Sequence, residues 1–176
     1  ASLTGKQNHP ASPEATGLEV DKLDKDAWER HFRCYLDMNK EAVKGRLGKE
    51  GISYMLVDSY EAAHQNWTPR LREEFTQRRG YDPILWYPVL TGQILQSPEQ
   101  SARFLGDWRK TIGELFEENF AVLDNLIKEE YGMKGCYVES HGNGRAFIAD
   151  GMSMKSHCDL PMSEIWVQGK VGTQNR

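Results

Sequence analysis

The chain has 176 residues, of which 39% are hydrophobic and 27% are charged, as in an ordinary globular domain. Its net charge of -4 argues against a nucleic-acid-binding protein, because such proteins usually present a basic face. No apolar run approaches the roughly 18 residues of a membrane helix, so we expect no membrane segment. Because the sequence has neither an initiator methionine nor a signal peptide, we expect it to be a piece of a longer polypeptide.

The first predicted helix follows a polar loop over residues 1–23. Asp24 suits the N-cap position, and apolar side chains recur after it at helical spacing. Gly48 is expected to end this helix. Residues 52–57, a short and partly β-branched apolar run, then predict a buried strand.

Two further helices are predicted from their end signals. Thr68 is expected to cap a short helix that Gly80 ends. A long helix is expected between Ser97, which is followed by proline, and Gly132. Residues 81–96, between these helices, predict an apolar loop or a broken helix.

The last part of the chain returns to strand patterns. Residues 136–139 predict a second buried strand, and residues 147–149 predict a weak third strand or a turn. Strands separated by helices pair in parallel through crossover connections. A complete (β/α)8 barrel needs about 250 residues, which is more than this chain has. We therefore predict an α/β fold, either a small open sheet or, as we prefer, a partial (β/α)8 TIM-type barrel over residues 24–166, followed by a tail over 167–176.

Three acids lie at or near predicted strand ends, namely Glu61, Glu139 and Glu164. In a parallel sheet they would meet at one edge, where α/β enzymes place their sites. Glycoside hydrolysis needs two such carboxyl groups, one to protonate the leaving oxygen and one to activate water or attack the sugar. A third could bind calcium, and Glu61 and Glu164 are the candidate ligands. Acids that are solvated or cap the next helix are the simpler alternative.

Polar and aromatic residues surround these acids in the sequence. Carboxylate, amide and imidazole groups hydrogen-bond to sugar hydroxyls, and aromatic rings pack against sugar faces. Trp67 could equally act as a stacking platform or pack at the start of the following helix. The candidate substrate-binding residues are Asp58, Tyr60, His64, Asn66, Trp67 and His141.

Two other functions stay open from the residues alone. A non-catalytic carbohydrate-binding or structural module would keep the aromatic platform while its acids point apart. A metal-dependent hydrolase would bring His64, His141 and Asp58 around one zinc ion, although the histidine spacings match no zinc motif.

Two residue types receive structural interpretations. The predicted short helix carries three arginines, Arg72, Arg78 and Arg79. We expect them to form a solvated, salt-bridged surface with the acids of the same helix. The three cysteines share no metal-type spacing and imply no disulfide framework. We expect Cys34, on a helix, and Cys136, in a strand, to be buried free thiols.

Several short motifs follow one another in the middle of the chain: Asp-Ser-Tyr-Glu from residue 58, Asn-Trp-Thr-Pro from residue 66, Arg-Glu-Glu-Phe from residue 72, Arg-Arg-Gly-Tyr-Asp from residue 78 and Pro-Val-Leu-Thr-Gly from residue 88. Their order resembles the catalytic barrel of glycoside hydrolase family 106, the α-L-rhamnosidases. The likeness extends more weakly from about Gly5 to Trp166.

The resemblance implies a (β/α)8 barrel, an inverting mechanism and a calcium ion that contacts the sugar. It also implies much longer chains with accessory β-domains, in the bacterial periplasm or secreted. We therefore expect a fragment of a glycosidase that removes terminal sugars from plant or microbial polysaccharides. Its expected partners are a carbohydrate substrate and the remainder of its own polypeptide, and it is not expected to bind nucleic acid. Glu61 is the first candidate for a catalytic acid or calcium ligand, with Glu139 and Glu164 in the complementary roles.

Overall fold

The structure is a computed structural model that describes residues 5–8, 11–58, 65–137 and 149–162. These residues form the following elements: η1 (Pro13–Ala15), α1 (Lys25–Ala42), η2 (Gly48–Glu50), β1 (Tyr54–Val57), α2 (Leu71–Arg79), η3 (Ile84–Thr91), α3 (Pro98–Tyr131), β2 (Lys134–Tyr137), α4 (Gly151–Lys155) and β3 (Leu160–Pro161). None of the helices in this described part is long and apolar enough to cross a membrane.

The three strands form one parallel sheet in the order β1-β2-β3, as the predicted crossover connections require. The two predicted buried strands begin two residues away from their expected starts, β1 later and β2 earlier. Neither α4 nor β3 was expected from the sequence. Most of the predicted third strand lies outside the described residues, and its last residue, Ala149, is in a bend. The structure therefore contains a small parallel sheet with crossover helices, without a closed barrel among the described residues.

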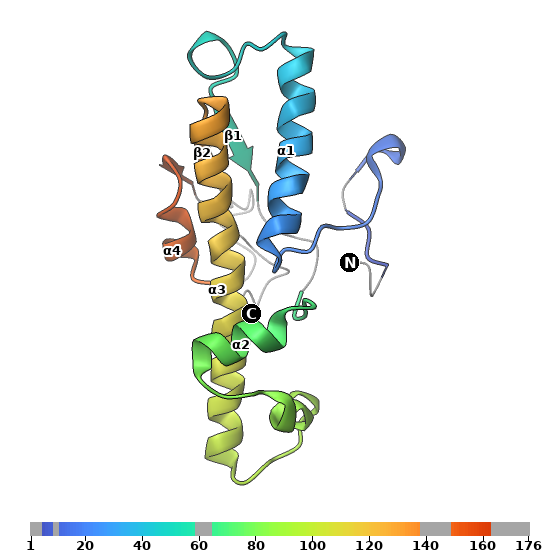
Figure 1. The fold of residues 1–176 in the computed structure, drawn as a ribbon, viewed down its shortest axis with the longest axis vertical. Helices are drawn as coiled ribbons and strands as arrows, with labels where there is room; N and C mark the ends of the chain where they lie inside the picture. Colours follow the sequence, from blue (N-terminus) through green and yellow to red (C-terminus); the bar gives the residue numbers. More distant parts are fainter. Residues whose placement is uncertain (1–4, 9–10, 59–64, 138–148, 163–176) are drawn as a thin grey trace, which may run out of the picture.

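Helix α3 is the central element of the molecule. It runs unbroken from the cap of Ser97, whose Oγ accepts a hydrogen bond from the Gln100 amide at 3.2 Å, to the left-handed Gly132. One part of α3 packs beside α1 and against β2, while α2 and η3 pack on the part that extends beyond the sheet (Figure 1). The core consequently follows the buried face of α3. There the ring centroids of Phe120 and Tyr137 are 5.2 Å apart.

Helix α1 begins as predicted, because the Asp24 carboxylate accepts hydrogen bonds from the amides of its first turn. It ends at Ala42 rather than at Gly48. The chain reverses earlier because Lys44 and Gly45 both adopt left-handed backbone angles, and the Gly45 amide donates to the Lys40 carbonyl at 2.8 Å. Gly48 instead lies in the short helix η2 that leads to β1.

Helix α2 begins at Leu71 and ends at the predicted glycine, Gly80. Thr68 does not cap it with its side chain as expected. The Thr68 hydroxyl instead donates to Asp21 Oδ2 at 2.9 Å, while its carbonyl accepts from the Leu71 amide. Residues 84–91, part of the predicted apolar loop or broken helix, form the 3-10 helix η3.

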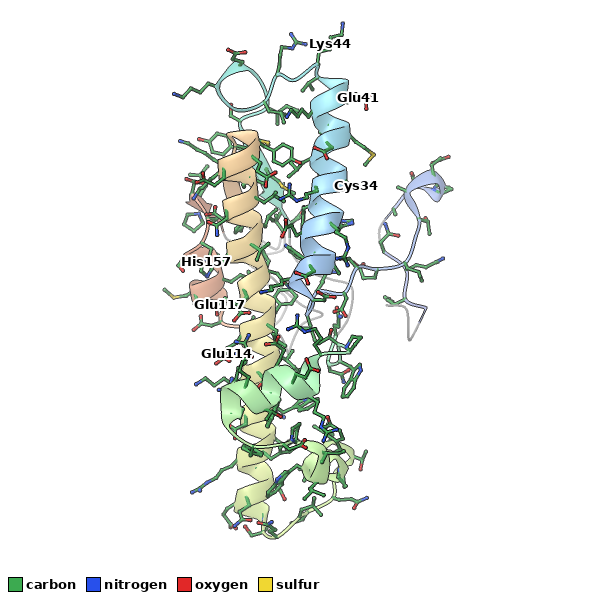
Figure 2. All side chains as sticks on the ribbon, in the orientation of Figure 1. Cys34, Glu41, Lys44, Glu114, Glu117 and His157 are labelled. Atoms are coloured by element: carbon green, nitrogen blue, oxygen red, sulfur yellow. The ribbon has the colours of Figure 1, made fainter. Side chains whose placement is uncertain are left out.

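All three cysteines are free thiols, as predicted for Cys34 and Cys136. Cys136 is buried in β2, but Cys34 is exposed, so the expectation of a buried Cys34 is wrong. Cys34 lies on α1, on the side that faces away from α3 (Figure 2). Helical position alone does not decide burial, since the helix buries only one stripe of side chains.

Candidate active site

The three strands of the sheet end at the same edge. Val57, the last residue of β1, is paired with Tyr137, the last residue of β2, and Tyr137 is paired with Pro161 at the end of β3. Neighbouring strands lie about 4.8 Å apart, so the three points where the chain leaves the sheet fall within about 10 Å. We call this the carboxyl edge of the sheet. In parallel α/β folds such an edge is where ligands bind.

Each predicted acid follows one of these three strand ends in the sequence. Glu61 comes four residues after Val57, Glu139 two residues after Tyr137, and Glu164 three residues after Pro161. The acids themselves lie outside the described residues, and so do three candidate substrate-binding residues, Tyr60, His64 and His141. Their roles therefore stay predictions.

The other three candidate residues are described. Asp58 directly follows β1 and is exposed at the carboxyl edge, and Asn66 is exposed where the described chain resumes. Trp67 keeps 39% of its surface exposed. Its ring packs edge-on against Tyr87, with 6.1 Å between the ring centroids, and its centroid lies 6.4 Å from that of Trp108. Trp67 is thus held by other aromatic rings while part of it remains open to solvent, which is compatible with both roles predicted for it.

Asp21 anchors the segment that returns from the carboxyl edge. Its carboxylate accepts hydrogen bonds from the Gln65 side chain and from the Thr68 hydroxyl, and it also accepts from the Leu23 amide at 2.9 Å. The Gln65 amide oxygen in turn accepts from the Lys22 amide at 2.9 Å. Asp21 therefore positions the segment that carries Trp67. The sequence offered no signal for this role, because Asp21 is one of several acids in a polar loop.

A charged cluster connects α2 to α3. Arg78 forms ion pairs with Glu74 at 3.2 Å and with Glu118 at 2.7 Å, and Arg79 forms one with Glu114. The side chains of Arg78 and Arg79 are only 20% and 10% exposed, so the prediction of a solvated surface is wrong for them. It holds for Arg72, which is half exposed and paired with Asp82 at 2.6 Å. The difference arises because α3 covers one face of α2.

The cluster shifts the pKa values of two of its members, Arg78 and Glu114. The hydrogen bond from Arg78 to Glu118 raises the pKa of the Arg78 guanidinium further above its usual range, although burial opposes this. Burial raises the pKa of the Glu114 carboxyl, but the hydrogen bond and charge of Arg79 and the charge of Arg78 outweigh it, so the pKa of Glu114 is lowered. Glu114 lies on α3 at the level of α2 (Figure 2). The ion pairs of Glu114 and Arg78 therefore hold α2 against α3.

Tyr137, at the end of β2, is a buried neutral phenol. Its side chain is fully buried, and its hydroxyl has no hydrogen-bond partner among the described residues. Burial first, and then the negative charge of Asp124, raises the pKa of Tyr137 far above its usual value. Tyr137 consequently stays protonated at neutral pH and supports the sheet edge rather than exchanging protons.

A sequence profile of the alpha-L-rhamnosidase family, glycoside hydrolase family 106, matches residues 1–176. The chain belongs to this family. The resemblance predicted from the motifs is therefore confirmed. A rhamnosidase from Novosphingobium sp. PP1Y matches the structure of this family 106 chain with a TM-score of 0.79 and 42% sequence identity, over 88% of this chain and 15% of that protein.

A second relative of this family 106 chain carries a different name. A protein of Formosa agariphila named "Putative beta-glucuronidase" is 32% identical over 169 residues, which are 94% of this chain and 14% of that protein. The chain thus spans about one seventh of the length of the two relatives. Residues outside this span complete those proteins, so the family membership describes the chain, while the activity of a whole protein requires its own argument.

No metal centre is formed by the described part of this family 106 chain. The described residues contain no group of three or more His, Cys, Asp or Glu side chains that could hold a metal ion. His157 Nε2 lies 3.6 Å from Glu117 Oε1, between α4 and α3, where the two side chains face each other (Figure 2). Cys158 Sγ donates to the Lys155 carbonyl at 3.1 Å. The predicted zinc ligands His64 and His141 lie outside the described residues.

Proposed function

We propose that the polypeptide containing this chain is an α-L-rhamnosidase-like glycoside hydrolase that removes terminal sugars from plant or microbial polysaccharides. The observation that carries the proposal is the register of the sheet, in which Val57, Tyr137 and Pro161 end their strands side by side. An acid follows each of these ends within four residues. Family membership and the rhamnosidase of similar structure support the choice of reaction.

In the proposed reaction the acids divide the two proton transfers. One carboxylic acid protonates the glycosidic oxygen as the bond to the anomeric carbon breaks. A second carboxylate removes a proton from the water that attacks the opposite face of the sugar, which inverts the configuration. We propose Glu61, Glu139 and Glu164 for these roles, with Glu61 as the first candidate. Asp58, Asn66 and Trp67, together with Tyr60, His64 and His141, would hold the sugar.

We propose that the sheet is one part of a (β/α)8 barrel that the rest of the polypeptide completes. One sheet face is buried, with Met55 pointing into the core beside the helices. Tyr54 and Leu56, which alternate with Met55, are 46% and 56% exposed, and Leu160 on β3 is 46% exposed. An apolar face of this kind requires a cover, which further parallel strands of a barrel would supply.

Calcium is proposed as a ligand of the same site, with Glu61 and Glu164 as its protein ligands. The donor set fits chemically, because calcium prefers carboxylate, carbonyl and hydroxyl oxygens, and the exposed Asp58 adds a further carboxylate at the end of β1. Bound calcium would supply oxygen coordination to the hydroxyls of the sugar and thereby help to orient it. Replacing both glutamates by glutamine should abolish stoichiometric calcium binding in equilibrium dialysis of the full polypeptide.

The test of the proposed function is turnover by the full polypeptide. We expect it to release L-rhamnose from an aryl α-L-rhamnoside and to act more slowly on an aryl β-D-glucuronide. The glucuronide is included because of the name of the Formosa relative. Glu61→Gln keeps the shape of the side chain but removes its charge or proton, so it should lower kcat on a rhamnosyl disaccharide by about 10²–10⁴-fold.

Glu41→Gln is the matched control, because Glu41 is an exposed acid near the C-terminal end of α1, far from α2 (Figure 2). Its kcat should equal that of the unchanged enzyme. An unchanged enzyme that cleaves neither glycoside would refute the proposed activity. A Glu61→Gln variant that is fully active on a rhamnosyl disaccharide would remove Glu61 from the mechanism.

A further inference from the structure

A cavity of about 610 Å³ lies between α1, α2 and α3. Its volume is within the roughly 300–1,000 Å³ of small-molecule sites. The wall combines the start of α1, the segment from Thr68 to α2, and the middle of α3. Helix α1 and strand β1 run in opposite directions, so the start of α1 lies towards the carboxyl edge of the sheet (Figure 1). The cavity is therefore on the side of the molecule that carries the candidate active site.

The charges on the wall balance. Its ionisable residues are three acids, Asp24, Glu74 and Glu118, and three bases, Lys25, Arg70 and Arg78. Most of them already have partners: Arg70 pairs with Glu74 at 3.3 Å, and Arg78 pairs with both Glu74 and Glu118. A cavity of this kind offers no net charge to an anion or a cation. It offers both hydrogen-bond donors and acceptors, which suits a neutral ligand with several hydroxyl groups.

Several wall groups have unused hydrogen-bonding capacity. Asn119 is only 1% exposed, and its amide nitrogen donates to the Lys22 carbonyl, but its Oδ1 has no partner among the described residues. Buried polar atoms are almost always paired, so this acceptor points to a missing partner. Gln77 and Lys25 are exposed on the same wall, and their side chains form no hydrogen bond or ion pair with described residues. Together they supply an acceptor and several donors.

We propose that this cavity is a binding subsite for a neutral saccharide unit, adjacent to the candidate active site. The proposal rests on the glycoside hydrolase function proposed above, which supplies the substrate class. The subsite would hold the sugar next to the rhamnose that is released. Gln77 and Lys25 would hydrogen-bond its hydroxyls at the mouth of the cavity, with Asn119 in its buried wall.

The test measures binding rather than turnover. The probe is a sulfur-linked, non-hydrolysable rhamnosyl-glucose disaccharide, titrated calorimetrically into the full polypeptide, with methyl α-L-rhamnoside as the shorter ligand. Gln77→Trp fills the cavity and Gln77→Ala removes the amide, both at an exposed helical position that should not disturb folding. We expect each to weaken disaccharide binding at least tenfold, and at least fivefold more than binding of the monosaccharide. Lys25→Ala should act in the same direction.

Gln100→Ala is the control, since Gln100 is an exposed glutamine in the first turn of α3, whereas the cavity lies at the middle of this helix. Wild-type disaccharide affinity in Gln77→Trp, an equal loss for both ligands, or no disaccharide binding by the unchanged protein would each overturn the subsite. A glucuronate-containing disaccharide that binds more tightly than the neutral one would overturn its neutral character. Failure of the proposed function appears separately, as the absence of hydrolysis by the unchanged enzyme in the aryl glycoside assay.

Discussion

Val57 and Tyr137 lie opposite each other as the last paired residues of β1 and β2, although 80 positions separate them in the sequence. The chain therefore leaves both strands at the same edge of the sheet. The segments that carry Glu61 and Glu139 start from these two neighbouring points. The functional predictions depend on this relationship, because two carboxyl groups act on one glycosidic bond only when they are about 5–10 Å apart.

The roles of the three acids should separate by leaving group. An activated aryl group departs without protonation, so loss of the general acid matters little for it, whereas a sugar leaving group needs the proton. Among Glu61→Gln, Glu139→Gln and Glu164→Gln in the full polypeptide, one variant should keep kcat within about tenfold on an activated aryl α-L-rhamnoside. The same variant should lose about 10²-fold or more on a rhamnosyl disaccharide. Steady-state kinetics with both substrates measures this, and three variants with equal losses on both would contradict the assignment.

The isolated 176-residue chain should be marginally stable or aggregate, with little or no glycosidase activity. Its exposed apolar sheet face and unpaired strand edges would be covered in a complete barrel. Leu56→Lys, on this face, should reduce light scattering of the isolated chain but lower the Tm of the full polypeptide. Leu18→Lys, at an equally exposed position outside the sheet, should do neither. A monomeric chain with a sharp transition above about 60 °C would instead indicate a self-sufficient α/β domain.

Gly51→Ala should destabilise the connection between α1 and β1. A Cβ atom at Gly51 would lie 1.9 Å from the Arg46 carbonyl oxygen, so the backbone itself would have to move. We expect a cost of about 2 kcal/mol or more, and therefore a lower Tm of the full polypeptide. Gly17→Ala is the control, because a Cβ atom there meets nothing within 4 Å. Scanning calorimetry of both variants tests the difference, and equal Tm values would show that the connection adapts.

Acid should weaken the attachment of α2 to α3 through Glu114. The pKa of the folded Glu114 carboxyl lies below its ordinary value of 4.5, mainly through Arg79 and Arg78 acting against burial. The ion pairs therefore stabilise the fold above about pH 4.5 and lose this contribution as the pH falls through the lowered pKa. Between pH 5 and pH 3 the Tm of Glu114→Gln should consequently fall less than that of the unchanged protein. Glu129→Gln, at an exposed acid on α3, should follow the unchanged protein.

Features that depend on neighbouring residues were predictable from the sequence. Asp24 and Ser97 cap their helices because a short polar side chain reaches the amides of the next turn. Gly80 and Gly132 end theirs because glycine enters the left-handed region at little cost. Strand–helix alternation likewise predicted parallel pairing, and the motifs from residue 58 onward predicted the family.

Features that depend on distant partners were decided only by the tertiary structure. Thr68 has the residue type of a cap, but Asp21, 47 positions away, binds its hydroxyl. Arg78 and Arg79 belong to a charged helix, but α3 covers them and supplies Glu114 and Glu118. The short β3 was not visible as a pattern, since its two residues form a strand only because β2 offers an edge. In each case the sequence determines which bonds a side chain can make, whereas folding determines which partner comes within reach.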